Sequence, residues 1–84
     1  MRKRGENSLK LFFHDKLIYA RRSLGWTQAK MAETLEVSER AYFKLDHGQT
    51  KCSALTLARF LIYVCSDPVE FLSELKETFE NNEL

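Results

Sequence analysis

Residues 25–48 read GWTQAKMAETLEVSERAYFKLDHG, and this stretch decides the fold. Gly25 suits the end of a preceding helix, because glycine tolerates the left-handed conformation found there. Thr27 and Ser38 each suit the position that caps the start of a helix. The stretch therefore predicts two short helices, at residues 28–35 and 39–46, with Gly48 just past the second. Two short helices joined by a tight turn form the helix-turn-helix geometry, in which the first helix braces the second.

Helical signals continue on both sides of this motif. Apolar residues recur every three or four positions between residues 8 and 24, which predicts an amphipathic helix before it. Ser53 suits the cap of a fourth helix at residues 54–65, and Asp67-Pro68-Val69-Glu70 has the composition of a fifth helix start. The chain of 84 residues has only three Gly and one Pro, so strands would lack their turns. The predicted fold class is all-α, a compact five-helix helix-turn-helix domain.

The length allows one domain with one small core. We expect this domain to span residues 8–80, with the helix-turn-helix motif at 28–48. Residues 1–7, which include Arg2, Lys3 and Arg4, are predicted to form a flexible basic arm. This arm could follow a nucleic-acid groove or serve only as a solubilising tail. Residues 81–84 are predicted to be a frayed acidic tail.

Charge is divided unevenly along the chain. Residues 1–66 contain twelve Lys or Arg and six acidic residues, whereas residues 67–84 contain one Lys and six acidic residues. A basic body with an acidic end suits a protein whose body meets a polyanion, although solvated helix faces also produce such a split.

Catalytic and membrane functions have little support in the sequence. The only histidines, His14 and His47, do not lie at a recognised spacing from a Ser or Cys nucleophile, and no Gly-rich phosphate loop is present. Cys52 and Cys65 lack further ligands at metal-binding spacing, so we expect reduced thiols. No apolar run has the length of a signal peptide or a membrane span. We expect a cytoplasmic protein that is not an enzyme and has no metal and no cofactor.

Several residues of the motif resemble those of the Cro/repressor-type, phage-repressor-like helix-turn-helix family over residues 17–72. The matching residues are Arg21, Gly25-Trp26-Thr27-Gln28, Met31-Ala32, Leu35, Val37-Ser38, Tyr42, Leu45-Asp46, Gly48, Leu57 and Leu61. The resemblance implies sequence-specific binding of double-stranded DNA by a transcriptional regulator that acts as a repressor, whose recognition helix at 39–46 enters the major groove.

The family register also implies which residues meet DNA. The exposed face of the recognition helix would read bases through Glu39, Arg40, Phe43 and Lys44. Contacts with the phosphate backbone would come from Gln28, Lys30, Ser38, Thr50 and Lys51. Arg21 and Asp46 resemble a structural ion pair of the family, which ties the first helix to the end of the third. A solvated helix face with mixed charges remains the alternative for the exposed residues.

The sequence departs from the family pattern in the turn and on the recognition helix. Glu36 stands where the family commonly has Gly, and a left-handed conformation there would cost about 1 kcal/mol and could distort the turn. Phe43 is apolar where a polar residue is usual, so it would touch a thymine methyl group or mark a protein-binding surface. Cys52 replaces a common Pro, which we expect to be neutral.

The fifth helix combines an apolar stripe with an acidic face. We predict a symmetric homodimer, suited to a pseudo-palindromic operator, joined through Phe71, Leu72, Leu75 and Phe79. The alternative is that this helix folds back on the core of its own chain. A different class of function also stays open, because surplus apolar residues would suit a protein interaction module, or the antitoxin of a toxin-antitoxin pair, built on the same fold.

Overall fold

The structure is a computed structural model that describes the backbone of residues 3–83 and the side chains of residues 9–81. It contains α1 (Lys3–Leu24), α2 (Gln28–Leu35), α3 (Glu39–Asp46), α4 (Ala54–Arg59), the π-helical turn η1 (Phe60–Val64) and α5 (Pro68–Glu83). Residues 3–83 contain no strand, so the predicted all-α class with five α-helices is confirmed. None of the helices in this part of the chain is long and apolar enough to cross a membrane.

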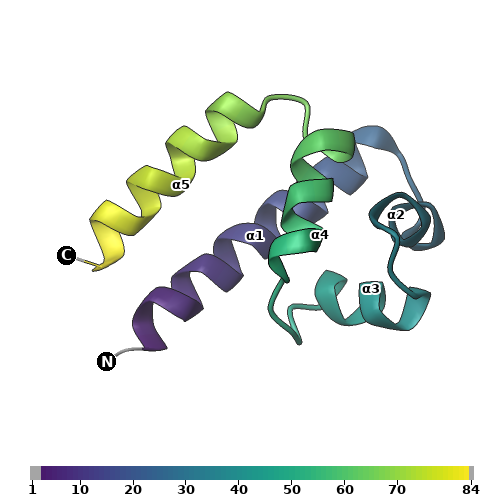
Figure 1. Ribbon diagram of the computed structural model, residues 1–84, viewed down its shortest axis with the longest axis horizontal. Coiled ribbons are helices and arrows are strands. Elements are labelled where there is room, and N and C mark those ends of the chain that lie inside the picture. Colours follow the sequence, from purple (N-terminus) through teal and green to yellow (C-terminus); the bar gives the residue numbers. More distant parts are fainter. Residues whose placement is uncertain (1–2, 84) are drawn as a thin grey trace.

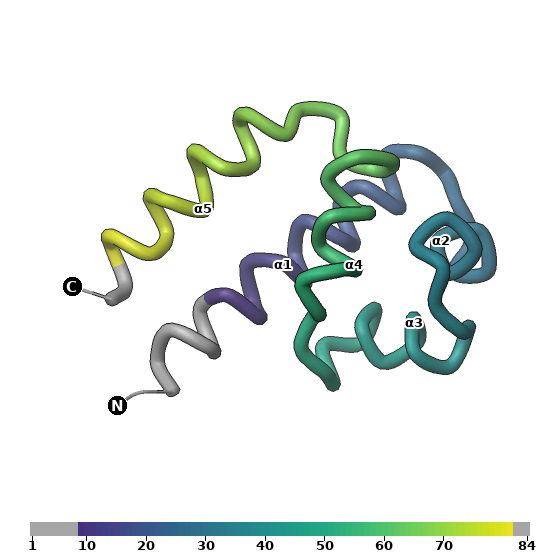
Figure 2. Tube along the Cα trace, viewed as in Figure 1, coloured from purple at the N-terminus to yellow at the C-terminus, as the bar shows by residue number. Residues whose placement is uncertain are grey.

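The helices pack around the C-terminal half of α1. In Figure 1, α5 runs back along α1, while α2 and α3 lie at the other end of the molecule, and α4 crosses in front of α1. The trace in Figure 2 follows the same path, and its two ends lie on the same side of the molecule. The core is formed by buried residues of α1, α2, α3, η1 and α5: Phe13, Leu17, Met31, Ala32, Leu35, Tyr42, Leu45, Phe60, Val64 and Phe71.

Local capping explains where the helices begin. Each predicted capping residue accepts a hydrogen bond from the backbone N–H three residues later, at 3.0 or 3.1 Å: Thr27, Ser38, Ser53 and Asp67. Gly25 and Gly48 have φ values of +69° and +68°, the left-handed conformation expected past a helix end. The predicted bounds of the two motif helices, residues 28–35 and 39–46, are therefore confirmed.

The ends of the chain differ from the prediction. Residues 3–7 belong to α1 instead of a flexible arm, and α5 continues through residues 81–83 instead of fraying. Both segments extend an existing helix, and adding a residue to a formed helix is far easier than nucleating a new one. The predicted groove contacts of Arg2, Lys3 and Arg4 lie outside the described side chains.

The fourth helix also differs from the uniform helix predicted at residues 54–65. After Arg59 the chain widens into η1, where the N–H of Cys65 donates to the carbonyl of Phe60 at 2.8 Å. This i→i+5 bond defines a π-helical turn. The turn keeps both Phe60 and Val64 buried. Packing of the two side chains against the core thus outweighs the regular α-helical hydrogen-bond pattern.

Candidate nucleic-acid interface

Helix α3 presents a largely polar face to solvent and buries its opposite face in the core. Tyr42 and Leu45 fix the helix in the core. The four predicted base-reading residues are all exposed: Glu39, Arg40, Phe43 and Lys44. The ring of Phe43 lies 4.0 Å from that of His47 between centroids. Among the described residues, Arg40 and Lys44 have no side-chain hydrogen bond or ion pair, so both side chains can reach outward.

A hollow lies between α3 and the start of α4, with a volume of 320 Å³. We call it the basic hollow, because Arg40, Lys44 and Lys51 line it and its described lining residues include no carboxylate. Ser38, Thr50 and Ser53 add hydroxyl groups to its wall, and Leu45 and Thr56 also line it. Cations and hydroxyl donors are suited to a phosphate group. The structure therefore brings two predicted base-reading residues together with three predicted phosphate-binding residues.

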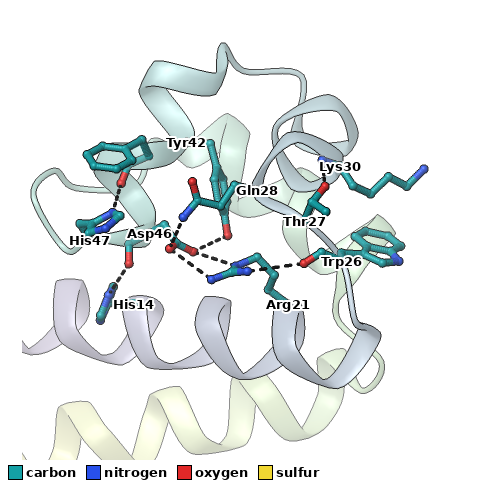
Figure 3. A network of polar contacts seen from close by, with 10 residues as sticks. His14, Arg21, Trp26, Thr27, Gln28, Lys30, Tyr42, Asp46 and His47 are labelled. Carbon is teal, nitrogen blue, oxygen red and sulfur yellow. Dashed lines mark hydrogen bonds and ion pairs between the residues drawn. The ribbon is translucent and has the colours of Figure 1, made fainter.

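Behind α3, the carboxylate of Asp46 joins three helices (Figure 3). Arg21 of α1 donates from Nε to Oδ1 at 3.0 Å and from Nη2 to Oδ2 at 3.3 Å. Gln28 Nε2 of α2 donates to Oδ2 at 3.0 Å, and Tyr42 Oη donates to Oδ1 at 2.9 Å. We call these four residues the Asp46 cluster. The predicted ion pair between Arg21 and Asp46 is present, and it holds α3 against α1 and α2.

The protonation of Tyr42 and a contact of His14 both support this arrangement. Burial, followed by the hydrogen bond to Asp46, raises the pKa of Tyr42 well above its ordinary value, so the hydroxyl remains a donor at neutral pH. The ring Nε2 of His14 lies 2.9 Å from the backbone carbonyl of Asp46. The end of α3 is therefore fixed to α1 by both its side chain and its main chain.

The start of α2 contains the other two predicted phosphate contacts. The side chain of Gln28 points to Asp46 and uses one of its two amide hydrogens there (Figure 3). Lys30 Nζ lies 5.3 Å from the centroid of the Trp26 ring. Neither residue lines the basic hollow. Their contact with phosphate stays a prediction, and Gln28 has an additional structural contact that the sequence did not suggest.

The turn between α2 and α3 is left-handed at Glu36, with φ 60° and ψ 43°. It is not distorted, because the N–H of Val37 donates to the carbonyl of Ala32 at 3.0 Å, as in a regular helix end. Arg59 of α4 braces it: Nη2 lies 3.3 Å from Oε1 of Glu36, and Nη1 lies 3.5 Å from the carbonyl of Leu35. The sequence analysis missed Arg59, although it is the only charged residue between Ala54 and Cys65.

The predicted dimer residues of α5 fall into two groups. Phe71 is only 4% exposed, and its ring lies 5.2 Å from that of Phe12 and 5.7 Å from that of Phe60. The prediction that Phe71 lies in a dimer interface is wrong, because packing within the chain already covers it. Leu72 and Phe79 are exposed, and Leu75 is partly buried against the core. The homodimer itself stays a prediction.

Among the described residues, no group of three or more His, Cys, Asp or Glu side chains could hold a metal ion. Comparison of the chain with family models, curated proteins and solved structures finds no significant match. The resemblance to the Cro/repressor-type family therefore rests on the residues of the motif alone.

Proposed function

We propose that the protein binds double-stranded DNA in a sequence-specific manner and regulates transcription, most simply as a repressor, in the cytoplasm. The observation that carries this proposal is the exposed face of α3 beside the basic hollow. Arg40 and Lys44 are exposed, and the described residues that line the hollow next to them include no carboxylate. The family resemblance of the motif supports the same function.

In this proposal α3 lies in the major groove and each side chain has a distinct task. Arg40 donates two hydrogen bonds to a guanine, Glu39 accepts from the amino group of a cytosine, and Phe43 contacts a thymine methyl group. Lys44 reaches a guanine or a phosphate. The phosphate backbone is bound by Gln28, Lys30, Ser38, Thr50 and Lys51.

Selection of binding sites from a random DNA library tests this function, and a palindromic consensus is the expected result. Arg40→Ala should then weaken binding to the selected site by about 1–3 kcal/mol and leave random DNA nearly unaffected. Gln28→Ala should weaken both alike, provided that the variant stays folded. Lys76→Ala, which removes an exposed cation from α5, is the control and should change neither. Failure to select any site would refute the proposal.

We further propose that the working form is a homodimer joined through Leu72, Leu75 and Phe79 of α5. The acidic residues of α5 would be repelled by phosphate, so this helix would face away from DNA and set the spacing of two recognition helices at about 34 Å. Sedimentation across a concentration series tests the dimer. Leu72→Glu should abolish it, whereas a monomer at tens of micromolar, alone and on a palindromic site, would refute it.

A protein interaction module or an antitoxin is the second candidate. It is favoured by three large apolar side chains that α4 and η1 leave exposed: Leu55, Ile62 and Tyr63. A gel-shift assay with random duplex DNA, at low and at high salt concentration, separates the two candidates. A DNA-binding protein should show this shift at low salt, whereas a module without DNA binding should not.

A further inference from the structure

A groove with a volume of 850 Å³ runs between α1 and α5. We call it the α1–α5 groove. Three core side chains line its floor, namely Phe60, Val64 and Phe71, beside the partly buried Phe12. Tyr19 and Leu24 add exposed apolar surface from α1. In Figure 1, α5 lies against α1 on the side away from α3, so the groove is remote from the proposed DNA interface.

The charges around the α1–α5 groove have the opposite sign to those of the basic hollow. Among the described residues that line it, Lys16 is the one cation, whereas five carboxylates line it: Asp15, Asp67, Glu70, Glu74 and Glu77. These carboxylates repel the phosphates of DNA and attract a cation. Nucleic acid is therefore a poor occupant of this groove.

Lys16 shows how the groove holds a cation. Its ammonium group forms an ion pair with Glu74 across the space between α1 and α5. The same Nζ atom lies 5.5 Å from the centroid of the Phe12 ring. A carboxylate on one side and an aromatic face on the other form a favourable environment for a Lys or Arg side chain. The remaining four carboxylates of the groove make no such contact with Lys16.

We infer that the α1–α5 groove binds a cationic amphipathic helix of a partner protein. Two helices packed side by side present a straight channel into which a third helix can pack at about 8–10 Å from each axis. The apolar face of the incoming helix covers the exposed surface of Tyr19 and Leu24, and its Lys or Arg residues meet Asp15, Glu70 and Glu77. This surface goes beyond the proposed function, because a partner can dock here while α3 contacts DNA.

Three model peptides of about 18 residues test the chemistry of the occupant, since this length gives about five helical turns. The first is an amphipathic helix of Leu and Lys, the second has the same composition without an apolar face, and the third replaces Lys with Glu. Fluorescence anisotropy of labelled peptides should show binding of the first and affinities at least about tenfold lower for the others. Equal binding of the first two peptides would reduce the interaction to unspecific charge attraction and overturn the inference.

Paired charge reversals test the location. Glu70→Lys with Glu77→Lys should lower the affinity for the Leu-Lys peptide by about tenfold or more, because the peptide then meets like charges. Glu33→Lys with Glu80→Lys makes the same change of charge at exposed residues that do not line the groove, and should alter the affinity less than about twofold. All four residues are exposed, and circular dichroism verifies that both variants fold.

Other outcomes decide against the inference. Equal losses in the two double variants would place the peptide elsewhere on the molecule. A concentration-dependent dimer that disappears in the Glu70→Lys, Glu77→Lys variant would identify a second copy of the chain as the occupant. DNA binding by the same variant is measured separately, so a failure of this inference is distinguishable from a failure of the proposed function.

Discussion

Helix α1 forms one ion pair with α3 and another with α5, and the two differ in their surroundings. Arg21 pairs with Asp46, whose side chain is only 6% exposed and also accepts hydrogen bonds from Gln28 and Tyr42. Lys16 pairs with Glu74, whose side chain is 38% exposed at the edge of the α1–α5 groove. The first carboxylate is surrounded by donors, whereas the second is open to solvent.

The comparison shows that α3 and α5 are attached to α1 by different forces. A buried carboxylate with several donors holds α3 in one orientation, since any displacement would leave polar groups without partners. A partly exposed ion pair contributes little, so α5 must depend on apolar contacts, chiefly those of Phe71 with Phe12 and Phe60. Rigid α3 suits a recognition element, and the less completely packed α5 suits a docking surface.

The largest expected effect comes from removing the apolar attachment of α5. Phe71→Ala should lower the free energy of unfolding by about 3–5 kcal/mol, because it opens a cavity beside Phe12 and Phe60. Leu72→Ala, at a neighbouring side chain that is 52% exposed, should cost less than about 1 kcal/mol in the monomer. Urea unfolding followed by circular dichroism measures both. Similar small losses would mean that α5 does not depend on Phe71.

Removing the buried carboxylate should have the next largest effect. Asp46→Ala leaves Arg21, Gln28 and Tyr42 without their common acceptor, which should cost about 3 kcal/mol in urea unfolding. Glu74→Ala breaks the partly exposed ion pair with Lys16 and should lower the free energy of unfolding by less than about 1 kcal/mol. Equal losses would remove the distinction between the two ion pairs.

Much of the helix-turn-helix region was predictable because its signals are local. Thr27 and Ser38 accept hydrogen bonds from residues three positions later, and Gly25 and Gly48 need only their own backbone conformation. Such interactions depend on the neighbouring sequence alone. The bounds of α2 and α3 and the exposed face of α3 therefore agree with the sequence analysis.

The contacts that the sequence analysis missed join residues far apart in the chain. Arg59 reaches the turn at Glu36, and Phe71 packs against Phe12, so both positions depend on how distant helices meet. The sequence predicts Gln28 only as a phosphate contact, whereas its hydrogen bond to Asp46 depends on how α2 meets α3. Capping rules and hydrophobic periodicity do not predict such contacts between distant residues. They do not predict the π-helical turn either, which places Phe60 and Val64 in the core.

The turn at Glu36 tests how well the α2–α3 region tolerates local strain. Glu36→Gly should raise the free energy of unfolding by about 0.5–1 kcal/mol, because glycine adopts the left-handed conformation at little cost. The variant also loses the ion pair with Arg59, but this loss reduces the gain in stability only slightly, because the Glu36 side chain is 63% exposed. Glu33→Gly, in the right-handed helix α2, should instead destabilise by about 1 kcal/mol. Destabilisation by Glu36→Gly would show that the contact with Arg59 outweighs the strain.

The smallest expected effect is a pH dependence that belongs to the Asp46 cluster. Tyr42 is fully buried, and burial raises its pKa above the ordinary value of 10.0. Above pH 10 the unfolded chain therefore releases the phenol proton while the folded chain retains it, so stability falls as pH rises. At about pH 10.5 this contribution amounts to about 1 kcal/mol relative to neutral pH.

Tyr42→Phe isolates that contribution. The variant should lose about 1 kcal/mol at pH 7, where the hydrogen bond to Asp46 is missing, but its stability should fall less between pH 8 and about 10.5 than that of the wild type. Burial also raises the pKa of Cys52 to about 11, which adds a fall in the same pH range. That fall is common to both proteins and cancels in their difference. Urea unfolding at several pH values measures the difference in stability between the wild type and Tyr42→Phe. If the two stability profiles run parallel over this pH range, Tyr42 does not titrate differently in the folded and unfolded chain.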